Sequence, residues 1–479
     1  MHILPVVKKF ARQQTGAPRP PLCWFVPSNR RRLASLLTGV KSNTPVVVIV
    51  GGGFGGLAAA KALKSAPAQV ILIDRTNHHL FQPLLYQVAT SVLSPAQIGS
   101  PLRGILRNQP NTSVFLGEVT GVNADEKYAL VNSADRENVR VDYDYLILAT
   151  GATHNYFGHN EFESHAPGLK NLSDAVAIRN KILRAFEQAE VEEDPSRHGD
   201  LLTFVLVGAG PTGVEMSSAI ADLARSTFKS EFRRIDPASA RIVLIDGVNR
   251  VLGTFSESLS SAAQAQLEKL GVEVRLGHNV EHIDAAGVIV GGQRIASKTV
   301  IWTAGVTPSP AGKWLGAQTD RAGRVLVGKD LTVPQHPEIF VIGDTGTSLD
   351  KHGKPLPGVA QVAIQQGHYV GRLLQRRMKG ASAPAPFSYF DKGNMAVVGK
   401  GFAILETGGL RFSGFLAMLV WAAVHLQFLA QSNLRVSVFM QWVWTYLTGQ
   451  RGSVLIVNHR SGQPISEAAE APPVRFMEK

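Results

Sequence analysis

The chain has 479 residues, 44% of them apolar and 18% charged, and its formal net charge is +12 at pH 7. This length and composition are typical of a globular protein with two or three domains. The single cysteine, Cys23, excludes a disulfide framework, a cysteine metal cluster and a Cys-x-x-Cys redox pair, and we predict no metal site. Eight Lys or Arg residues and no acid lie in residues 1–44, so the rest of the chain is nearly neutral and we expect no nucleic-acid partner.

Residues 1–44 are predicted to be a disordered basic extension, because they include Pro18, Pro20, Pro21 and Pro27 and show no sustained helical or strand period. No apolar stretch follows the charges, so a secretory signal is not indicated. The Arg-rich, acid-free character is similar to that of an organelle transit peptide. An unstructured extension, or a start codon placed too early, explains it as well.

The first strand signal, over 46–50, leads into a glycine-rich turn and a helix expected from about Gly55 to Ser65. In such a turn, glycines let backbone N–H groups approach a pyrophosphate that lies on the helix N-terminus. The next strand, over 70–73, ends on Asp74, where an acid can bind the hydroxyls of an adenosine ribose. The predicted dinucleotide residues of this turn are Gly51, Gly53, Phe54 and Gly56.

A second unit repeats this order, with a strand over 204–207, a turn holding Gly208, Gly210 and Gly213, and a strand over 242–245 that ends on Asp246. A carboxylate there accepts the ribose 2′-OH and repels a 2′-phosphate, so we predict NADH in preference to NADPH. Arg250 could partly offset that repulsion. Because two dinucleotides held by one enzyme usually exchange a hydride, a flavin and a nicotinamide are the natural pair.

Three more buried strands end in polar or glycine residues that fit a flavin fold: 145–149 before Thr150 and Gly151, 300–304 before Gly305, and 339–342 before Gly343 and Asp344. We predict an α/β fold with two Rossmann-like dinucleotide-binding domains. The FAD domain (45–164 and 311–400) would be interrupted by the nicotinamide domain (165–310).

The C-terminal part is predicted to attach to a membrane over 401–460, with a flexible tail over 461–479. Residues 414–430 are almost wholly apolar, but 17 residues fall short of the about 20 needed to cross a bilayer. The next segment carries an apolar stripe with arginines at its ends, which is typical of a helix lying among lipid headgroups. A packed hairpin or a dimer interface is the alternative. The stripe comprises Val436, Phe439, Met440, Val443, Trp444 and Leu447, between Arg435 and Arg451.

The two glycine turns, the run Asn-His-His-Leu-Phe-Gln-Pro-Leu-Leu-Tyr over 77–86 and the run Ala-Gln-Val-Ala-Ile-Gln-Gln-Gly over 360–367 resemble type II NADH:quinone dehydrogenase. The resemblance covers about residues 45–460. It implies FAD in the first site, NADH in the second, and reduction of a membrane quinone to quinol without proton pumping.

The resemblance also implies roles for individual residues. The first turn and Asp74 would hold FAD, with Thr150 and Asp344 along the rest of it, and the second turn and Asp246 would hold NADH. Glu215 would lie near the nicotinamide and flavin, and Gln361 and Gln365 would face the flavin at the quinone pocket. The family commonly has Glu where this chain has Asp74 and Asp246.

These roles have simpler alternatives. Glu215 is equally explained as an acid that favours a helix N-terminus. Gln361 and Gln365, four apart, present neutral amides on one helix face, where an amide can donate to a quinone carbonyl or remain solvated. A membrane enzyme of this kind would be peripheral on the cytoplasmic face of the inner membrane, or on an organelle membrane if 1–44 is a transit peptide, and it could be a homodimer. The rival functions are a soluble NADH-dependent flavin reductase for a protein acceptor and a non-enzymatic NADH-sensing flavoprotein.

Overall fold

A six-stranded sheet carries the first glycine turn at its carboxyl edge. The computed structural model of the chain describes residues 44–457, so the predictions for 1–43 and for 461–479 lie outside the described residues. Every pairing in this sheet is parallel except that of the edge strand β20. Its order is β20 (Thr332–Val333), β21 (His336–Val341), β9 (Tyr145–Leu148), β1 (Val46–Val50), β2 (Gln69–Asp74) and β5 (Thr112–Leu116).

A second, four-stranded sheet is parallel throughout. Its order is β13 (Val272–Leu276), β12 (Arg241–Asp246), β11 (Thr203–Val207) and β17 (Thr299–Trp302). Both sheets have central strands built from aliphatic runs, β1 and β11, as expected where helices cover both faces. The strands of the second sheet fall between β9 and β21 in the chain, so one parallel unit interrupts the other. The predicted α/β class is confirmed.

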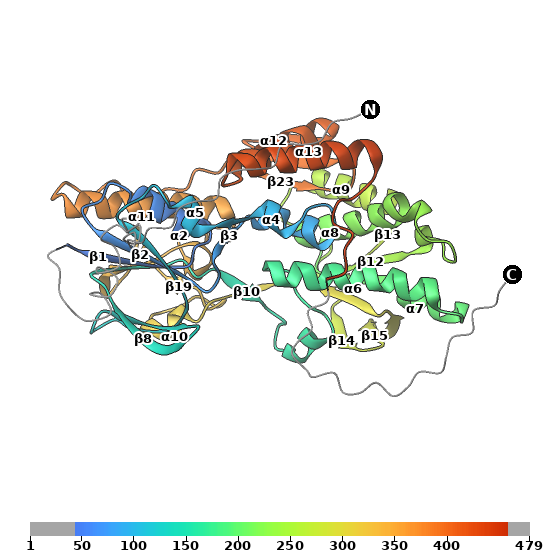
Figure 1. Ribbon diagram of the computed structural model, residues 1–479, viewed down its shortest axis with the longest axis horizontal. Coiled ribbons are helices and arrows are strands. Elements are labelled where there is room, and N and C mark those ends of the chain that lie inside the picture. Colours follow the sequence, from blue (N-terminus) through green and yellow to red (C-terminus); the bar gives the residue numbers. More distant parts are fainter. Residues whose placement is uncertain (1–43, 458–479) are drawn as a thin grey trace, which may run out of the picture. The chain divides into compact units, whose positions relative to one another are not determined.

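Helices α2 (Phe54–Ala62) and α8 (Pro211–Asp222) follow the two glycine turns. The first begins one residue before the predicted start and ends three residues before the predicted end, at Ala62. Helix α11 (Ala360–Met378) packs along α2 (Figure 1). A Cβ added at Gly367 would lie 2.2 Å from the carbonyl oxygen of Gly55, so the two backbones meet where only glycine fits.

The remaining elements complete the described chain. The other helices are α3 (Leu85–Ala89), α4 (Pro95–Ile98), α5 (Leu102–Ile105), α6 (Leu172–Val191), α7 (His198–Leu201), α9 (Glu257–Lys269), α10 (Ala311–Leu315), α12 (Phe415–Phe428) and α13 (Ser432–Thr448). Three antiparallel sheets comprise β6 (Glu118–Asn123), β7 (Tyr128–Ser133) and β8 (Arg136–Asp142); β14 (Val280–Asp284), β15 (Gly287–Val290) and β16 (Gln293–Ala296); and β23 (Asn394–Val397), β24 (Ala403–Thr407) and β25 (Leu410–Gly414). Short paired strands are β3 (His78–Leu80) with β4 (Gly99–Pro101), β10 (Ala152–His154) with β18 (Val306–Pro308), and β19 (Val325–Leu326) with β22 (Gly346–Thr347).

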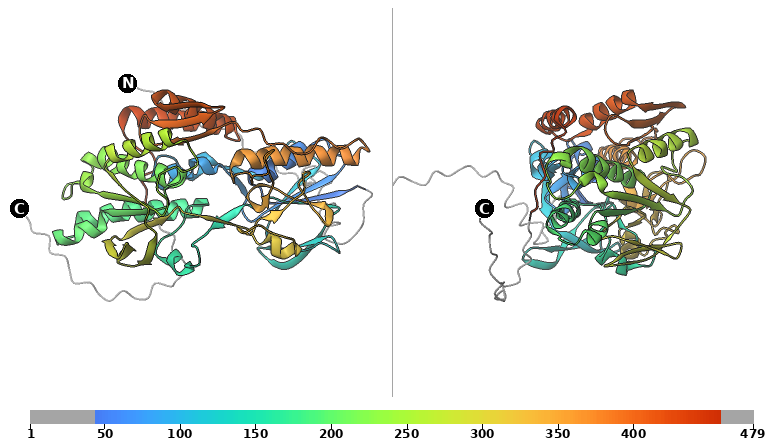
Figure 2. Two further views of the ribbon diagram at one scale, coloured as in Figure 1. Left: turned by 180° about the vertical axis from the view of Figure 1, so that it is seen from behind. Right: turned by 90° about the vertical axis from the view of Figure 1, so that its right-hand side faces the viewer.

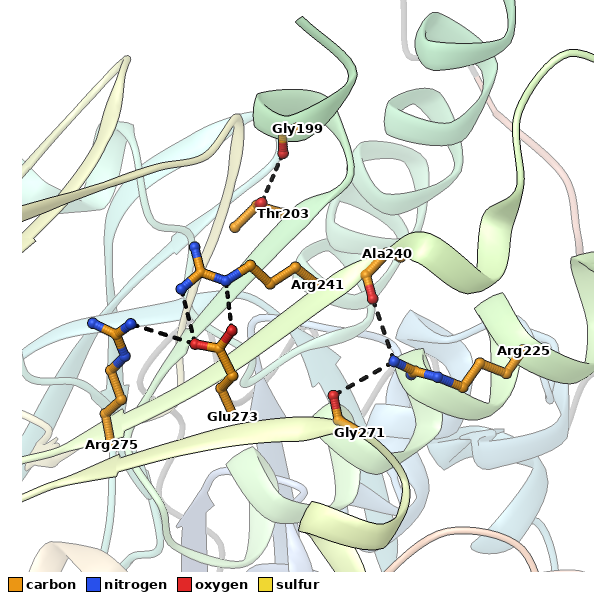
Figure 3. Close-up of polar contacts among 8 residues, drawn as sticks. All are labelled: Gly199, Thr203, Arg225, Ala240, Arg241, Gly271, Glu273 and Arg275. Atoms are coloured by element: carbon orange, nitrogen blue, oxygen red, sulfur yellow. Dashed lines mark hydrogen bonds and ion pairs between the residues drawn. The ribbon is translucent and has the colours of Figure 1, made fainter. Parts of the chain in front are cut away.

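Charged side chains join β12 to β13, as Figure 3 shows. The guanidinium of Arg241 donates to both carboxylate oxygens of Glu273, at 2.6 and 2.8 Å, and Arg275 lies 3.4 Å from the same carboxylate. These groups are 34–43% exposed, so water screens them and each pair contributes at most about 1 kcal/mol. Aliphatic burial, not this cluster, stabilises the sheet.

Helices α12 and α13 lie side by side as a hairpin (Figure 2). Leu416 and Leu447 are 72% and 76% exposed, whereas Trp421 and Val438 face inward and are buried. Among residues 44–457, no helix combines the length and the apolar character needed to cross a bilayer. The predicted amphipathic helix is therefore present as α13, while its attachment to a membrane stays a prediction. All six residues of the predicted stripe are exposed: Val436, Phe439, Met440, Val443, Trp444 and Leu447.

Candidate functional site

The two glycine turns have the same backbone geometry. Gly51 and Gly208 adopt φ of +101° and +110°, in the left-handed region that favours glycine. A Cβ added at Gly56 or Gly213 would lie 1.8 Å from the carbonyl oxygen of Gly51 or Gly208, respectively. Each turn therefore needs glycine at its first and last positions for internal reasons, whatever it binds.

The middle glycines, Gly53 and Gly210, are different because a Cβ built there meets no chain atom within 4 Å. Both are extended N-cap residues, and neither α2 nor α8 has an acid in its first turn. The positive end of each helix is thus open to an anion. Phe54, the first residue of α2, packs edge-on against His79 and so supports the turn from the protein side.

A cavity of about 810 Å³ lies along the carboxyl edge of the first sheet. Its volume, open glycine backbone and polar walls fit an FAD molecule. Lys170 also lines it and was not predicted, since a lysine in a loop before α6 carries no sequence signal. Burial raises the pKa of Asp344, and the nearby positive charge of Lys170 opposes that shift. Eight of the predicted FAD residues line the cavity: Gly51, Gly53, Phe54, Asp74, Thr150, Gly151, Gly343 and Asp344.

The acids at the strand ends bind their own glycine turns. One carboxylate oxygen of Asp74 accepts from the amide of Gly52 at 2.6 Å, and Asp246 accepts from Ala209 at the same distance. The other oxygen of Asp74 accepts from the amide and hydroxyl of Thr76. Unused lone pairs remain for a ribose hydroxyl, so both acids still fit an adenosine.

Three predicted residues act within the protein framework. The hydroxyl of Thr150 bonds Ser309 and, at 3.1 Å, Thr345, so it holds together the loops after β9 and β21. The amide of Gly343 donates to the buried Gln366 at 2.7 Å. Gly305 lies against the ring of Phe157, and a Cβ added at Gly305 would lie 2.5 Å from that ring. Neither Phe157 nor Gln366 had been assigned a role from the sequence.

The glutamine amides of α11 share one helix face, as their spacing predicts, and both bind the segment 390–393. Gln361 donates to the carbonyl of Gly393 at 3.1 Å, and Gln365 donates to and accepts from the backbone of Phe390 at 2.9 and 3.0 Å. Neither is among the residues lining the 810 Å³ cavity. The carbonyl oxygen of the Gln361 side chain is buried and has no partner within the described residues, so it can accept a bond from a bound molecule.

A second cavity, of about 360 Å³, lies under the α12–α13 hairpin and is lined mostly by apolar side chains. Glu215 lines it rather than the larger cavity, so a position beside the flavin stays a prediction. Burial raises the pKa of Glu215 to about 8, opposed by the weak 3.5 Å bond from the amide of Val397. Asp222 and Arg451 also line this cavity, and the sequence analysis placed neither of them in a cavity.

The arginines at the ends of α13 bind the protein backbone. Arg451 donates to the carbonyls of Thr90 and Ala219 at 2.5 and 3.0 Å, and Arg435 donates to Leu429. Burial lowers the pKa of Arg451 to about 10. The sequence interpretation placed these two guanidiniums among lipid headgroups. In the structure they donate to backbone carbonyls instead, because the last carbonyls of a helix have no donor within the helix.

Comparison with known proteins gives the family. Residues 45–367 match the model of the pyridine nucleotide-disulphide oxidoreductases. The type II NADH:quinone oxidoreductase Ndh of Mycobacterium tuberculosis is 44% identical over 427 residues, covering 87% of this chain and 91% of that protein. The chain belongs to the type II NADH:quinone oxidoreductases. A second such oxidoreductase of that organism, NdhA, is 42% identical over 425 residues, covering 86% of this chain and 89% of NdhA.

Solved structures agree on the fold of this type II oxidoreductase. NDH2 of Plasmodium falciparum in complex with NADH has a TM-score of 0.78 at 21% identity, covering 85% of this chain and 99% of that one. The sulfide:quinone oxidoreductase of Aquifex aeolicus has a TM-score of 0.63 at 16% identity, covering 85% and 92%. These identities show the fold alone. The paired cysteines implied by the family's disulphide name are absent, since Cys23 is the single cysteine of the whole chain.

Proposed function

We propose that this chain oxidises NADH and reduces a quinone to a quinol, with FAD as the intermediate carrier. The observation that carries the proposal is the pair of matched glycine turns, one on each parallel sheet, each with an open middle glycine and a strand-end acid. Two dinucleotides and no cysteine pair leave direct transfer from flavin to the last acceptor as the available chemistry. The type II relatives named for NADH and quinone support this assignment.

FAD, when bound, supplies the atom that accepts a hydride and the two electrons that pass onward. The residues of the chain would then hold the FAD and the NADH and orient them for hydride transfer. Gly51, Gly53, Gly56 and Asp74 would hold the pyrophosphate and adenosine ribose of FAD. The matching NADH residues would be Gly208, Gly210, Gly213 and Asp246. Residues 45–164 and 311–400 would form the FAD domain, and residues 165–310 would form the NADH domain.

Gln361, Gln365 and Glu215 would serve the quinone. The unpartnered side-chain oxygen of Gln361 suits a quinol hydroxyl, and an amide does not titrate as its substrate gains protons. With a pKa of about 8, Glu215 keeps its proton at pH 7 and can release one to a reduced product. Gln365 would act by holding the segment at Phe390 in place.

The exposed face of α13 would lie in the headgroup layer of a membrane, on the cytoplasmic side of a cell inner membrane. Support comes from the continuous stripe of exposed apolar side chains at helical spacing, which a water-exposed helix does not need. A quinone dissolved in lipid would then reach the protein beside the hairpin. A homodimer that covers the same stripe is the competing use of this surface.

An anaerobic two-step experiment tests the function. Purified protein is mixed with NADH while flavin absorbance is followed, and a short-chain quinone is added once the absorbance has bleached. We expect bleaching and then recovery, and in Gln361→Met we expect recovery to slow at least tenfold with little change in bleaching. A colourless protein that FAD cannot reconstitute, or bleaching with no recovery for any quinone, would contradict the proposal.

A further inference from the structure

A chain of hydrogen bonds joins three residues that line the 360 Å³ cavity: Trp442 of the C-terminal hairpin, Gln87 and Tyr86. The indole N–H of Trp442, on α13, donates to the side-chain carbonyl of Gln87 at 2.7 Å. The amide nitrogen of Gln87 donates in turn to the hydroxyl oxygen of Tyr86 at 3.1 Å. Tyr86 and Gln87 are buried on α3, so this chain of bonds fixes one side of the hydroxyl.

The hydroxyl proton of Tyr86 is left without an acceptor. Within residues 44–457 the one bond made by that hydroxyl is the bond it accepts from Gln87. Tyr86 is 5% exposed, and burial together with the charge of Glu215 holds its pKa well above the usual value, so the group stays a neutral donor. Because burying a donor without an acceptor is costly, the arrangement points to an acceptor brought by a ligand.

The rest of the cavity describes that ligand. Apolar side chains of α12 and α13, including Phe415, Met418 and Phe439, line much of it, and Tyr86 and Glu215 are among its polar groups. A flat apolar molecule with a carbonyl oxygen would fill the apolar part of the cavity and would accept a hydrogen bond from the Tyr86 hydroxyl. A lipid acyl chain would fill the apolar part but would leave the Tyr86 hydroxyl unpaired, so the observations favour a quinone.

We propose that Tyr86 donates a hydrogen bond to a carbonyl oxygen of the quinone in this cavity, and that Gln87 and Trp442 are positioning residues that aim the hydroxyl. The inference rests on the proposed function, since it names a binding group for the same substrate. Through Trp442, a helix of the hairpin sets the geometry of a polar group inside the protein.

The decisive variant is Tyr86→Phe, which removes one oxygen and keeps the ring. We expect the KM for a short-chain quinone to rise about five- to tenfold, as for loss of one buried hydrogen bond. The rate of anaerobic bleaching by NADH and the KM for NADH should not change. In a titration of the oxidised protein, quenching of tryptophan fluorescence by the quinone should shift to higher concentration by the same factor, because Trp421 and Trp442 line the cavity.

Trp442→Phe tests the positioning role, since it keeps an aromatic ring but removes the N–H donor. We expect a two- to fourfold rise in quinone KM and no further rise when it is combined with Tyr86→Phe. Tyr128→Phe is the matched control: the hydroxyl of Tyr128, on β7, accepts from the side-chain amide of Asn123 at 3.4 Å, and Tyr128 is absent from the lining of both cavities. Its quinone KM should equal that of the wild type.

Several results would overturn the inference. One is a quinone KM of Tyr86→Phe that equals that of the wild type, while the wild-type flavin recovers when quinone is added. This result would exclude the role of Tyr86 in quinone binding but would leave the proposed function supported. Equal effects of Tyr86→Phe and Tyr128→Phe on the quinone KM, or slowed bleaching in Tyr86→Phe, would show a general packing defect. A phospholipid that co-purifies in equal amount and is not displaced by quinone would assign the cavity to lipid. If wild-type flavin never recovers with quinone, both the function and the inference fail.

Discussion

The carboxylate of Asp74 accepts a 2.6 Å hydrogen bond from the amide of Gly52, the second residue of the first glycine turn. Asp246 repeats this bond at the same length with Ala209 in the second turn. Hydrogen bonds to charged groups contribute about 1.5–3 kcal/mol each. Each acid therefore helps to fix the conformation of its own turn.

Asp74→Asn should weaken FAD binding about tenfold or more. An NH2 group then replaces one of the two carboxylate oxygens, and it cannot accept the hydrogen bonds that Asp74 accepts from Gly52 and Thr76. The measurement is the ratio of flavin to protein absorbance after gel filtration, with titration of the apoprotein by FAD. Asp246→Asn is the paired control. It should keep full flavin content and raise the KM for NADH by a similar factor, with relatively better use of NADPH. Equal flavin loss in both variants would contradict the assignment of one turn to each nucleotide.

Gly210→Ala and Gly213→Ala should differ although they are three residues apart. A Cβ at Gly213 would sit 1.8 Å from the carbonyl of Gly208, so the turn must open and we expect a lowered Tm. A Cβ at Gly210 meets no chain atom, so that variant should fold normally yet bind NADH at least tenfold more weakly. Thermal unfolding and NADH titration measure the two effects. Normal NADH affinity in a folded Gly210→Ala variant would rule out a pyrophosphate at this turn.

Glu215 should give the enzyme a pH dependence. Its folded pKa of about 8 lies above the usual 4.5, so the folded chain retains a proton that the unfolded chain releases. The stabilising contribution is complete below pH 4.5 and is lost as the pH rises through 8. Quinone reduction should fall above pH 8 for the same reason.

The corresponding variant is Glu215→Gln, which cannot ionise. Relative to wild type its Tm should be about 2–4 °C higher at pH 9 and equal at pH 5, and the alkaline fall in quinone reduction should vanish. Glu137→Gln, at an exposed position on β8, is the control and should keep the wild-type profile. An unchanged alkaline limb in Glu215→Gln would assign the titration to another group.

Membrane binding should depend on one face of α13. Val436, Met440 and Trp444, spaced four apart and 55–63% exposed, are absent from the cavity lining. Changing all three to Glu should reduce co-sedimentation with anionic lipid vesicles more than tenfold, since each apolar side chain loses its burial. Turnover with a water-soluble quinone should persist.

The matched control for this triple variant changes three exposed apolar residues elsewhere, Leu116, Val191 and Leu349, to Glu. Vesicle binding should then remain. If the α13 variant instead binds vesicles normally but becomes monomeric by light scattering, the stripe is a dimer interface and not a membrane surface.

The fold was predictable where local chemistry decides it. Both glycine turns, the strands that enter them and the strand-end acids follow from period, glycine spacing and burial, and they lie at the predicted places. The amphipathic helix at α13 was predictable for the same reason. The bonds that Asp74 and Asp246 make to their own turns were not, since a strand-end acid gives no sign of which donors reach it.

The site was less predictable wherever distant segments meet. Arg451 was assigned to lipid headgroups, yet it lies beside Thr90 and Ala219, far away in the chain. Trp442 and Gln87 pair across 355 positions. No periodicity encodes such contacts, because they depend on how α3, α8 and the hairpin pack together.

The interrupted order of the sheets has a consequence for biosynthesis. Strands β11 to β17 emerge without interruption, whereas β9 ends at Leu148 and its neighbour β21 begins at His336. At about 5–20 residues per second, the ribosome leaves that edge of the first sheet uncovered for on the order of 10–40 s. Helix α11, which packs closely against α2 at Gly367 and Gly371, emerges later still. The second sheet can therefore form while the chain is still on the ribosome, whereas the first sheet and helix α11 are complete only when the last quarter of the polypeptide emerges.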